Sequence, residues 1–261
     1  MEIISDAALK RILSDKTSGS GELLLKLNNY LSKKQVNVRN IQRLIPKLKK
    51  HFQSFENIQK YLLELNKLIR ADKLSPEFFT NFSDKTRSSN KIFVNALPYF
   101  QRHKIVLTIS NSLTVLELLK RIRKEKRNLE VIVCESRPKL EGRIMASSLA
   151  EVGIKVQLIT ESMMSEYVQK SDAVIIGADV ILKNGDVVNK VGSKTLAILC
   201  KEFKKPFYIA ADKSKFSKKN KFVQREELKN EIWRTAPKKI LIVNRYFEII
   251  PKTYITKIFT D

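Results

Sequence analysis

Two arginines, Arg137 and Arg143, lie six positions apart in the stretch "CESRPKLEGR" (134–143). An apolar run comes before them and a helical pattern follows. A guanidinium group can grip a phosphate or carboxylate through two parallel hydrogen bonds. Two such groups at the end of a strand would suit an anionic ligand. The alternative is that they pair with the neighbouring carboxylates Glu135 and Glu141.

Other polar residues follow apolar runs in the same half of the chain. Ser110, Asp179 and Lys215 each come shortly after such a run, and Asn189 and Lys190 follow Asp179 by about ten positions. In a parallel sheet, ligands bind at the carboxyl ends of the strands, where helix N-termini offer free N–H groups to anions. The set suits a phosphorylated, hydroxyl-rich ligand. Each residue also has a structural alternative, since Ser110 can cap a helix and Asp179 can serve a turn.

From about residue 103, short β-branched apolar runs alternate with amphipathic helical patterns. This alternation is typical of a parallel sheet covered by helices on both faces. The sequence therefore predicts a Rossmann-like α/β domain, although no G-x-G-x-x-G motif follows any run. The expected strands are 104–109, 129–135, 155–159, 172–177, 206–210 and 239–243, and the expected helices are 112–125, 141–153, 163–169 and 193–204.

The first hundred residues have a different spacing of apolar residues. Apolar positions recur every three to four residues, which is the helical period, and no strand-like alternation appears. The prediction is an α/β protein with a helical N-terminal domain over residues 1–100 and a Rossmann-like, mostly parallel sheet domain over 101–261. The expected helices are 6–14, 20–33, 38–51 and 54–72, with a kink or break at Pro46.

The net charge of +23 calls for anionic partners. Nucleic acid is one candidate, but no binding motif or aromatic interleaving specifies RNA contact, and a solvated lysine-rich surface is the plainer interpretation. Cys134 and Cys200 lie in apolar runs without His or Cys at metal-ligand spacing. The sequence therefore predicts a reduced, cytoplasmic protein with no metal, no cofactor and no membrane segment.

Four stretches, in order, resemble one known family: "ESRPKLEGR" (135–143), "VIIGADVILKNGDVVNKVGS" (174–193), "KPFYIAADKSKF" (205–216) and "YFEIIP" (246–251). It is the family of the alpha, beta and delta subunits of eukaryotic translation initiation factor 2B. The family also holds methylthioribose-1-phosphate isomerase and ribose-1,5-bisphosphate isomerase. A weaker likeness covers "DKTSGSGELLLKL" (15–27), which is similar to the family's N-terminal glycine motif.

The resemblance implies a sugar-phosphate cleft between the two domains and dimerisation through the C-terminal domain. It also implies roles for particular residues. The expected ligand-binding or phosphate-binding residues are Ser18, Gly19, Arg137, Arg143, Asn189, Lys190 and Lys215, and Asp179 matches the catalytic aspartate of the isomerases.

Two positions depart from the isomerase pattern. Ser110 stands where the resemblance places a catalytic cysteine, and a hydroxyl is far harder to deprotonate than a thiol. Ser18 precedes Gly19 where the isomerases have an arginine, as serine does in the initiation-factor subunits. Both changes argue against a standard isomerase, whereas Asp179 argues in favour of one.

These residues support three functions. The first is a weakly catalytic or non-catalytic binder of a sugar phosphate or nucleotide. The second is an intramolecular aldose–ketose isomerase of a sugar 1-phosphate, with Asp179 and Ser110 as catalytic residues. The third is a regulatory subunit of a guanine-nucleotide exchange assembly, with protein partners in translation. A homodimer or larger homo-oligomer is expected in each case.

Overall fold

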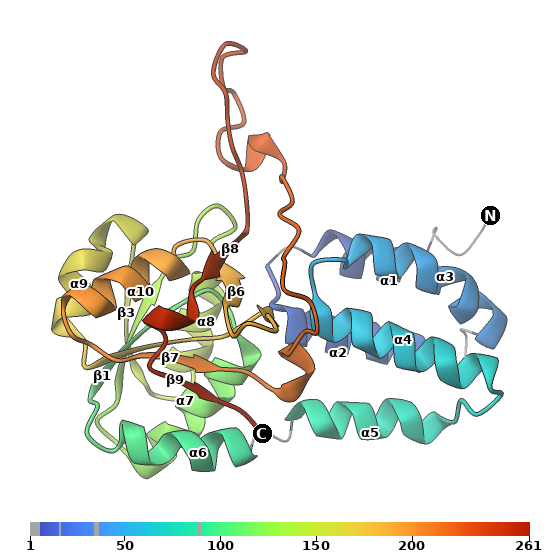
Figure 1. The fold of residues 1–261 in the computed structure, drawn as a ribbon, viewed down its shortest axis with the longest axis horizontal. Helices are drawn as coiled ribbons and strands as arrows, with labels where there is room; N and C mark the ends of the chain where they lie inside the picture. Colours follow the sequence, from blue (N-terminus) through green and yellow to red (C-terminus); the bar gives the residue numbers. More distant parts are fainter. Residues whose placement is uncertain (1–5, 16, 34–36, 88–89) are drawn as a thin grey trace.

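The computed structural model describes residues 6–15, 17–33, 37–87 and 90–261, and shows a helical part beside an α/β part (Figure 1). The helical part packs around one apolar core, to which α2 contributes Leu23, Leu27 and Leu31 at helical spacing. The helix α3 runs through Pro46, so no break occurs there. The helices of this part are α1 (Ala7–Ser14), α2 (Ser20–Leu31), α3 (Val38–His51), α4 (Glu56–Arg70) and α5 (Pro76–Arg87).

The α/β part is built on a sheet of six strands in the order β3-β2-β1-β4-β7-β9, and every neighbouring pair is parallel. Five of its strands match the predicted runs, so the predicted fold class is confirmed. The sixth, β9, was not predicted. The strands are β1 (Ile105–Ile109), β2 (Glu130–Cys134), β3 (Lys155–Ile159), β4 (Ala173–Ile176), β7 (Phe207–Ala210) and β9 (Lys257–Phe259).

Helices cover both faces of this sheet and enclose two separate apolar cores. One core joins the sheet to three helices on one face, and the other joins it to two helices on the opposite face. The helix α6, which precedes residue 101, buries Ile92, Ala96 and Phe100 in the first core. The covering helices are α6 (Asn90–Phe100), α7 (Leu113–Glu125) and α8 (Glu141–Ala150), and α9 (Met164–Lys170) and α10 (Ser193–Glu202).

A small antiparallel sheet in the order β5-β6-β8 follows the carboxyl end of β4. Its strands are β5 (Val180–Ile181), β6 (Val187–Lys190) and β8 (Phe247–Ile250). Asn189 and Lys190 end β6 and are buried. This sheet therefore carries two of the predicted binding residues toward the end of the main sheet.

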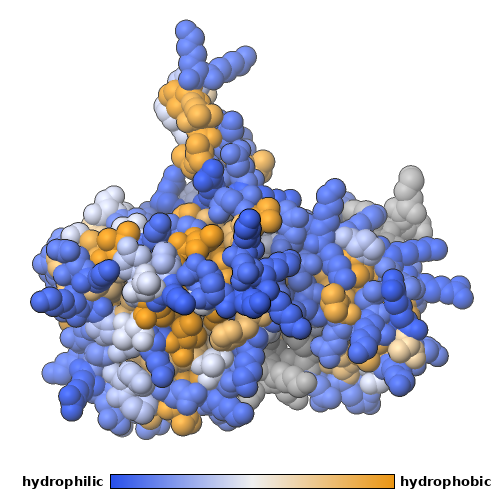
Figure 2. Space-filling view, in the orientation of Figure 1, coloured by the Kyte–Doolittle hydropathy of each residue, from blue (hydrophilic) through white to orange (hydrophobic). Residues whose placement is uncertain are grey.

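The chain between the short helix η4 (Lys229–Glu231) and β8 stands out from the body as a long projection (Figure 1). The run 239–243, predicted as a strand, lies here outside any strand, so that prediction is wrong. Three of its apolar residues are exposed instead of buried, Ile240 by 47%, Leu241 by 81% and Val243 by 54%. An apolar band is visible along the projection in Figure 2. None of the helices in the described ranges has the length and apolar character needed to span a bilayer.

Gly142 lies where α8 passes closest to β2. A Cβ atom there would lie 1.9 Å from the carbonyl oxygen of Cys134, so α8 would have to move away from the strand. We expect Gly142→Ala to lower the free energy of unfolding by about 2–3 kcal/mol. In Gly21→Ala, on α2, the added Cβ finds an ordinary contact at 3.9 Å. This control should gain about 0.5–1 kcal/mol. Urea denaturation of both variants tests the pair, and equal effects would contradict the packing argument.

Candidate functional site

A cavity of about 130 Å³ lies between the helical part and the α/β part. A smaller cavity of about 40 Å³ adjoins it, and both are lined by Gly19, Ser20, Ser110 and Asp179. The structure therefore brings several predicted site residues together at one place. Ser18 and Lys190 line the larger cavity, and Asn189 and Lys215 line the smaller one.

The N-terminus of α2 opens toward both cavities. Gly19 is the N-cap of this helix, and it provides no side-chain hydrogen bond to the first turn. The loop between β1 and α7 passes so close that a Cβ on Gly19 would lie 2.4 Å from the carbonyl oxygen of Asn111. Glycine is thus needed to bring the helix end against the end of β1. A helix end of this kind favours an anionic group.

The loop before α2 folds around the carboxylate of Asp15. Asp15 accepts hydrogen bonds from the backbone N–H groups of Thr17 and Ser18 at 3.1 and 3.0 Å, and from the Ser18 hydroxyl at 2.8 Å. Lys26 also pairs with Asp15 at 2.8 Å. Burial alone would raise the pKa of Asp15, but the hydrogen bonds from Lys26 and Ser18 outweigh it and hold this pKa well below its ordinary value. The arrangement fixes Ser18 and Gly19 at the cavity wall.

Asp179 is bound from the helical part. The Ser20 hydroxyl donates to Asp179 Oδ1 at 2.8 Å, and the Lys215 ammonium donates to the Ser20 oxygen. The desolvation of Asp179 raises its pKa, and the charge of Lys215 acts against this rise. Burial lowers the pKa of Lys215 in turn, against the charge of Asp179. Ser20 therefore bridges two opposite charges of the α/β part.

A second buried pair lies across the site. Lys190 Nζ is 2.5 Å from Glu141 Oε1, and the two residues are 3% and 6% exposed. The Ser110 hydroxyl donates to the same carboxylate oxygen at 3.4 Å. Burial raises the pKa of Glu141, and the nearby Lys190 charge opposes this rise. The serine at the end of β1 thus has a carboxylate partner that its sequence neighbours do not supply.

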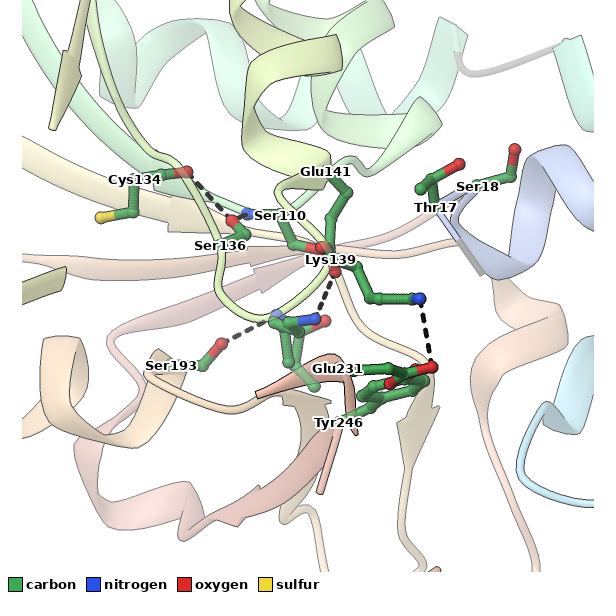
Figure 3. A network of polar contacts seen from close by, with 12 residues as sticks. Thr17, Ser18, Ser110, Cys134, Ser136, Lys139, Glu141, Ser193, Glu231 and Tyr246 are labelled. Carbon is green, nitrogen blue, oxygen red and sulfur yellow. Dashed lines mark hydrogen bonds and ion pairs between the residues drawn. The ribbon is translucent and has the colours of Figure 1, made fainter. Parts of the chain in front are cut away.

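The Lys190 ammonium also lies over the ring of Tyr246, 5.0 Å from its centroid. The Tyr246 hydroxyl donates to Glu231, and Glu231 pairs with Lys139 at 3.1 Å. Figure 3 shows this set between the β2–α8 loop and the chain that leads back from the projection. The Tyr246 ring is thus a second partner of Lys190 besides Glu141.

Sharp turns place the side chains at the strand ends. Ser110 and Ser136, just after β1 and β2, have φ values of 70° and 69°, in the left-handed region. The Ser110 N–H donates to the Ser136 hydroxyl at 2.7 Å, and Ser136 donates to the carbonyl of Cys134 at 2.9 Å. Asn189 donates to the Ser193 hydroxyl at 2.9 Å. Neighbouring polar groups therefore fix both Ser110 and Asn189.

The arginine pair takes a different position. Neither Arg137 nor Arg143 is among the described residues that line the two cavities. Arg143 pairs with Glu135 at 2.9 Å, and Arg137 donates to the carbonyl of Ile232 at 3.3 Å. For Arg143 the structure thus shows the carboxylate pairing that the sequence left open. A contact of either guanidinium with a ligand stays a prediction.

Several residues of the site were not predicted as functional. Ser20 and Glu141 lie within stretches that the sequence had singled out, but there each is only the first residue of a helix. Only the packing of distant elements shows their partners. The others in the larger cavity include Asp15, His51, Arg225, Glu227 and Tyr246. In the part of the chain that the structure describes, no group of three His, Cys, Asp or Glu side chains could hold a metal ion.

Comparisons with known proteins agree with this architecture. A model of the Initiation factor 2 subunit family matches residues 7–261, and the chain belongs to that family. It is 35% identical over 162 residues to a ribose 1,5-bisphosphate isomerase of Archaeoglobus fulgidus, a match that covers 60% of this chain and 52% of the relative. It is 31% identical over 224 residues to the alpha subunit of translation initiation factor eIF2B of Dictyostelium discoideum, which covers 80% and 66%.

The chain spans about half the length of the ribose 1,5-bisphosphate isomerase and of other curated relatives that it matches. Among solved structures, the translation initiation factor eIF-2B of Pyrococcus horikoshii superposes with a TM-score of 0.73 and 24% identity, covering 99% of this chain and 94% of that one. A likeness at this identity supports the fold. The relatives include both isomerases and initiation-factor subunits, so family membership does not choose between them.

The bridge through Ser20 predicts a large effect on stability. Lys215→Met leaves Asp179 without its counter-ion, and we expect it to lower the free energy of unfolding by about 3 kcal/mol at pH 7. Adding Asp179→Asn should recover most of this loss, because the uncompensated charge is then gone. Chemical denaturation measures both. Lys155→Met is the matched control, because it breaks an exposed pair with Glu130 (side chains 69% and 30% exposed) and should cost less than about 1 kcal/mol. An equally small loss in Lys215→Met would refute the prediction.

Proposed function

We propose that this protein binds a phosphorylated sugar or a nucleotide in the larger cavity and is weakly catalytic or non-catalytic. The observation that carries the proposal is the meeting of the α2 N-terminus with two buried lysines, Lys190 and Lys215, at one pair of cavities. The helix end and the Ser18 loop suit the phosphate group. Ser110, Asp179 and Asn189 suit hydroxyl groups of the sugar.

Arg137 and Arg143 remain candidate binding residues for a ligand group that extends past the cavity lining. Arg225, at the wall of the larger cavity, is a further candidate cation on the side of the helical part. Its guanidinium donates to the carbonyl of His51 at 3.4 Å. The proposed ligand therefore has its phosphate at α2 and its remaining groups toward the α/β part.

Aldose–ketose isomerisation of a sugar 1-phosphate is the second candidate function. The specific observation in its favour is that Asp179 lies at the cavity, where it accepts a hydrogen bond from Ser20 and burial raises its pKa above the ordinary value for a carboxyl group. Asp179 and Ser110 would be its catalytic residues. Two relatives carry names consistent with this reaction, a ribose 1,5-bisphosphate isomerase and a methylthioribose-1-phosphate isomerase.

A regulatory place in a translation-factor assembly is the third candidate. The projection with its exposed apolar residues favours a protein partner, which could be another copy of this chain in a homodimer or larger homo-oligomer. The relatives include initiation-factor subunits. The two buried free cysteines suit a reducing compartment, so a cytoplasmic location completes the proposal.

A ligand screen tests the binding function. We expect ribose 1,5-bisphosphate, methylthioribose 1-phosphate or a nucleoside monophosphate to stabilise the fold by about 2.7 kcal/mol at a hundred times its dissociation constant. Lys190→Met should weaken the best ligand about ten- to a hundredfold in calorimetry, because a charge-assisted hydrogen bond is lost. Lys194→Met, at an exposed position four residues on, is the control and should bind as the unmodified protein does. If none of the three ligand types binds, the proposed function is wrong.

A further inference from the structure

Ser110 is placed as a reactive side chain would be, at the end of β1 and against the cavity. Its left-handed backbone, with φ of 70°, turns the chain sharply between the strand and α7. Its N–H donates to the Ser136 hydroxyl, and its own hydroxyl donates to Glu141. A serine hydroxyl becomes a useful base or nucleophile only when a neighbouring group takes its proton.

Glu141 is suited to take that proton. It is the first residue of α8 and is almost fully buried, with Oε1 shared between Ser110 and Lys190. Its other oxygen, Oε2, has no hydrogen-bond partner among the described residues. Burial raises the pKa of this carboxyl, which makes it a stronger proton acceptor than an exposed glutamate. The distance of 3.4 Å to Ser110 is long, but such contacts often shorten when a ligand closes the site.

Lys190 fixes the position of Glu141. It reaches the carboxylate from β6 and also lies over the Tyr246 ring, whose hydroxyl donates to Glu231. The groups that face Glu141 are thus Ser110 from the β1 end, Lys190 from β6 and Tyr246 from the segment before β8. Asp179, the other carboxylate of the cavity, is bound to Ser20 instead. The two carboxylates therefore have separate hydrogen-bond partners, and the charge of Lys190 acts on the pKa of both.

We propose that Glu141 is the proton acceptor for Ser110, and that the two form a relay which removes a carbon-bound hydrogen from the bound sugar. In a sugar 1-phosphate the ring opens first: the bond from C1 to the ring oxygen breaks, Asp179 gives a proton to that oxygen, and C1 is left as a phosphorylated oxocarbenium ion. The C2 hydrogen then leaves as a proton to the Ser110 oxygen, while the hydroxyl proton of Ser110 moves to Glu141, and the electron pair of the broken C–H bond forms the C1–C2 double bond of an enol phosphate. Return of the proton to C1 and loss of the C2 hydroxyl proton to Asp179 leave the C2 ketone and complete the aldose–ketose shift.

The relay rests on the proposed binding function and adds a mechanism for its weak catalysis. Ser110 would touch the sugar, whereas Glu141 would act through Ser110 and is a positioning and proton-accepting residue. The relay predicts a specific pH dependence. Because Glu141 must be deprotonated to accept the proton, exchange should rise with pH through the pKa of this carboxyl and level off above it.

The test is deuterium incorporation into the carbon-bound positions of ribose 1,5-bisphosphate or methylthioribose 1-phosphate, followed by NMR in D2O with the full chain. We expect slow exchange with the unmodified protein. Glu141→Gln should lower the exchange rate at least about a hundredfold, remove its rise with pH and change the dissociation constant less than tenfold. Ser110→Ala should lose exchange to the same extent. In a Ser110→Cys background, Glu141→Gln should cost much less, since a thiol ionises without the carboxylate.

Glu141→Asp guards against a variant that simply misfolds. The shorter side chain keeps the negative charge but withdraws Oε1 from both Ser110 and Lys190. Its circular dichroism and melting temperature show whether it is folded, and the folded variant should lose exchange. Exchange that persists within threefold in Glu141→Gln, or a pH profile unchanged by it, would overturn the relay. A ligand that binds the unmodified protein without any exchange would also overturn it, and would leave the binding function standing. Absence of binding by every phosphorylated ligand would instead refute the binding function itself.

Discussion

The cost of removing charge from water is the constraint on which this site depends. A buried ion is tolerated only when a partner compensates it, and in this protein two lysines and two carboxylates are brought together for that reason. Lys190 contacts Glu141 directly, whereas Lys215 reaches Asp179 through the Ser20 hydroxyl. Because Ser20 belongs to the helical part, the second arrangement is complete only when α2 is seated against the α/β part. The same contacts that satisfy the charges therefore also build the cavity.

Close backbone approach is the second requirement, and it is met by glycine. Gly19 allows α2 to contact the carbonyl of Asn111, and Gly177 leaves room for the Ser112 side chain, which a Cβ would approach to 2.4 Å. Without these two positions the loops after β1 and β4 could not meet the N-terminus of α2. Positive φ values at Ser110 and Ser136 add two sharp turns at neighbouring strand ends. The polar groups thus converge because the backbone, not side-chain length, brings them close.

The sequence predicted the layers of this fold better than the site. Apolar runs and helical spacing identify five strands of the main sheet and most of its helices, because burial on both faces leaves a continuous apolar signal. The same rule failed at 239–243, where an apolar run lies in the exposed projection, and it missed β9. Ser110, Asp179, Lys190 and Lys215 were singled out because they follow strands, and they do meet at the cavities. Glu141 and Ser20 were not, since their partners come from elements far away in the chain.

The charge of the site differs from the charge of the whole molecule. The chain carries a net charge of +23, which attracts anions over long distances. Yet the four buried ions of the site are two lysines and two carboxylates, so they sum to zero. The positive surface of the protein would therefore attract a phosphorylated ligand. Within the site, the N–H groups of α2, hydroxyl groups and the ammonium group of Lys190 would position it. Because Asp15, Glu227 and Arg225 also line the larger cavity, the site has no excess of positive charge. It therefore discriminates by the arrangement of hydrogen-bond donors and acceptors more than by total charge. That property is what the proposed function requires, since a site for one sugar phosphate must exclude other anions.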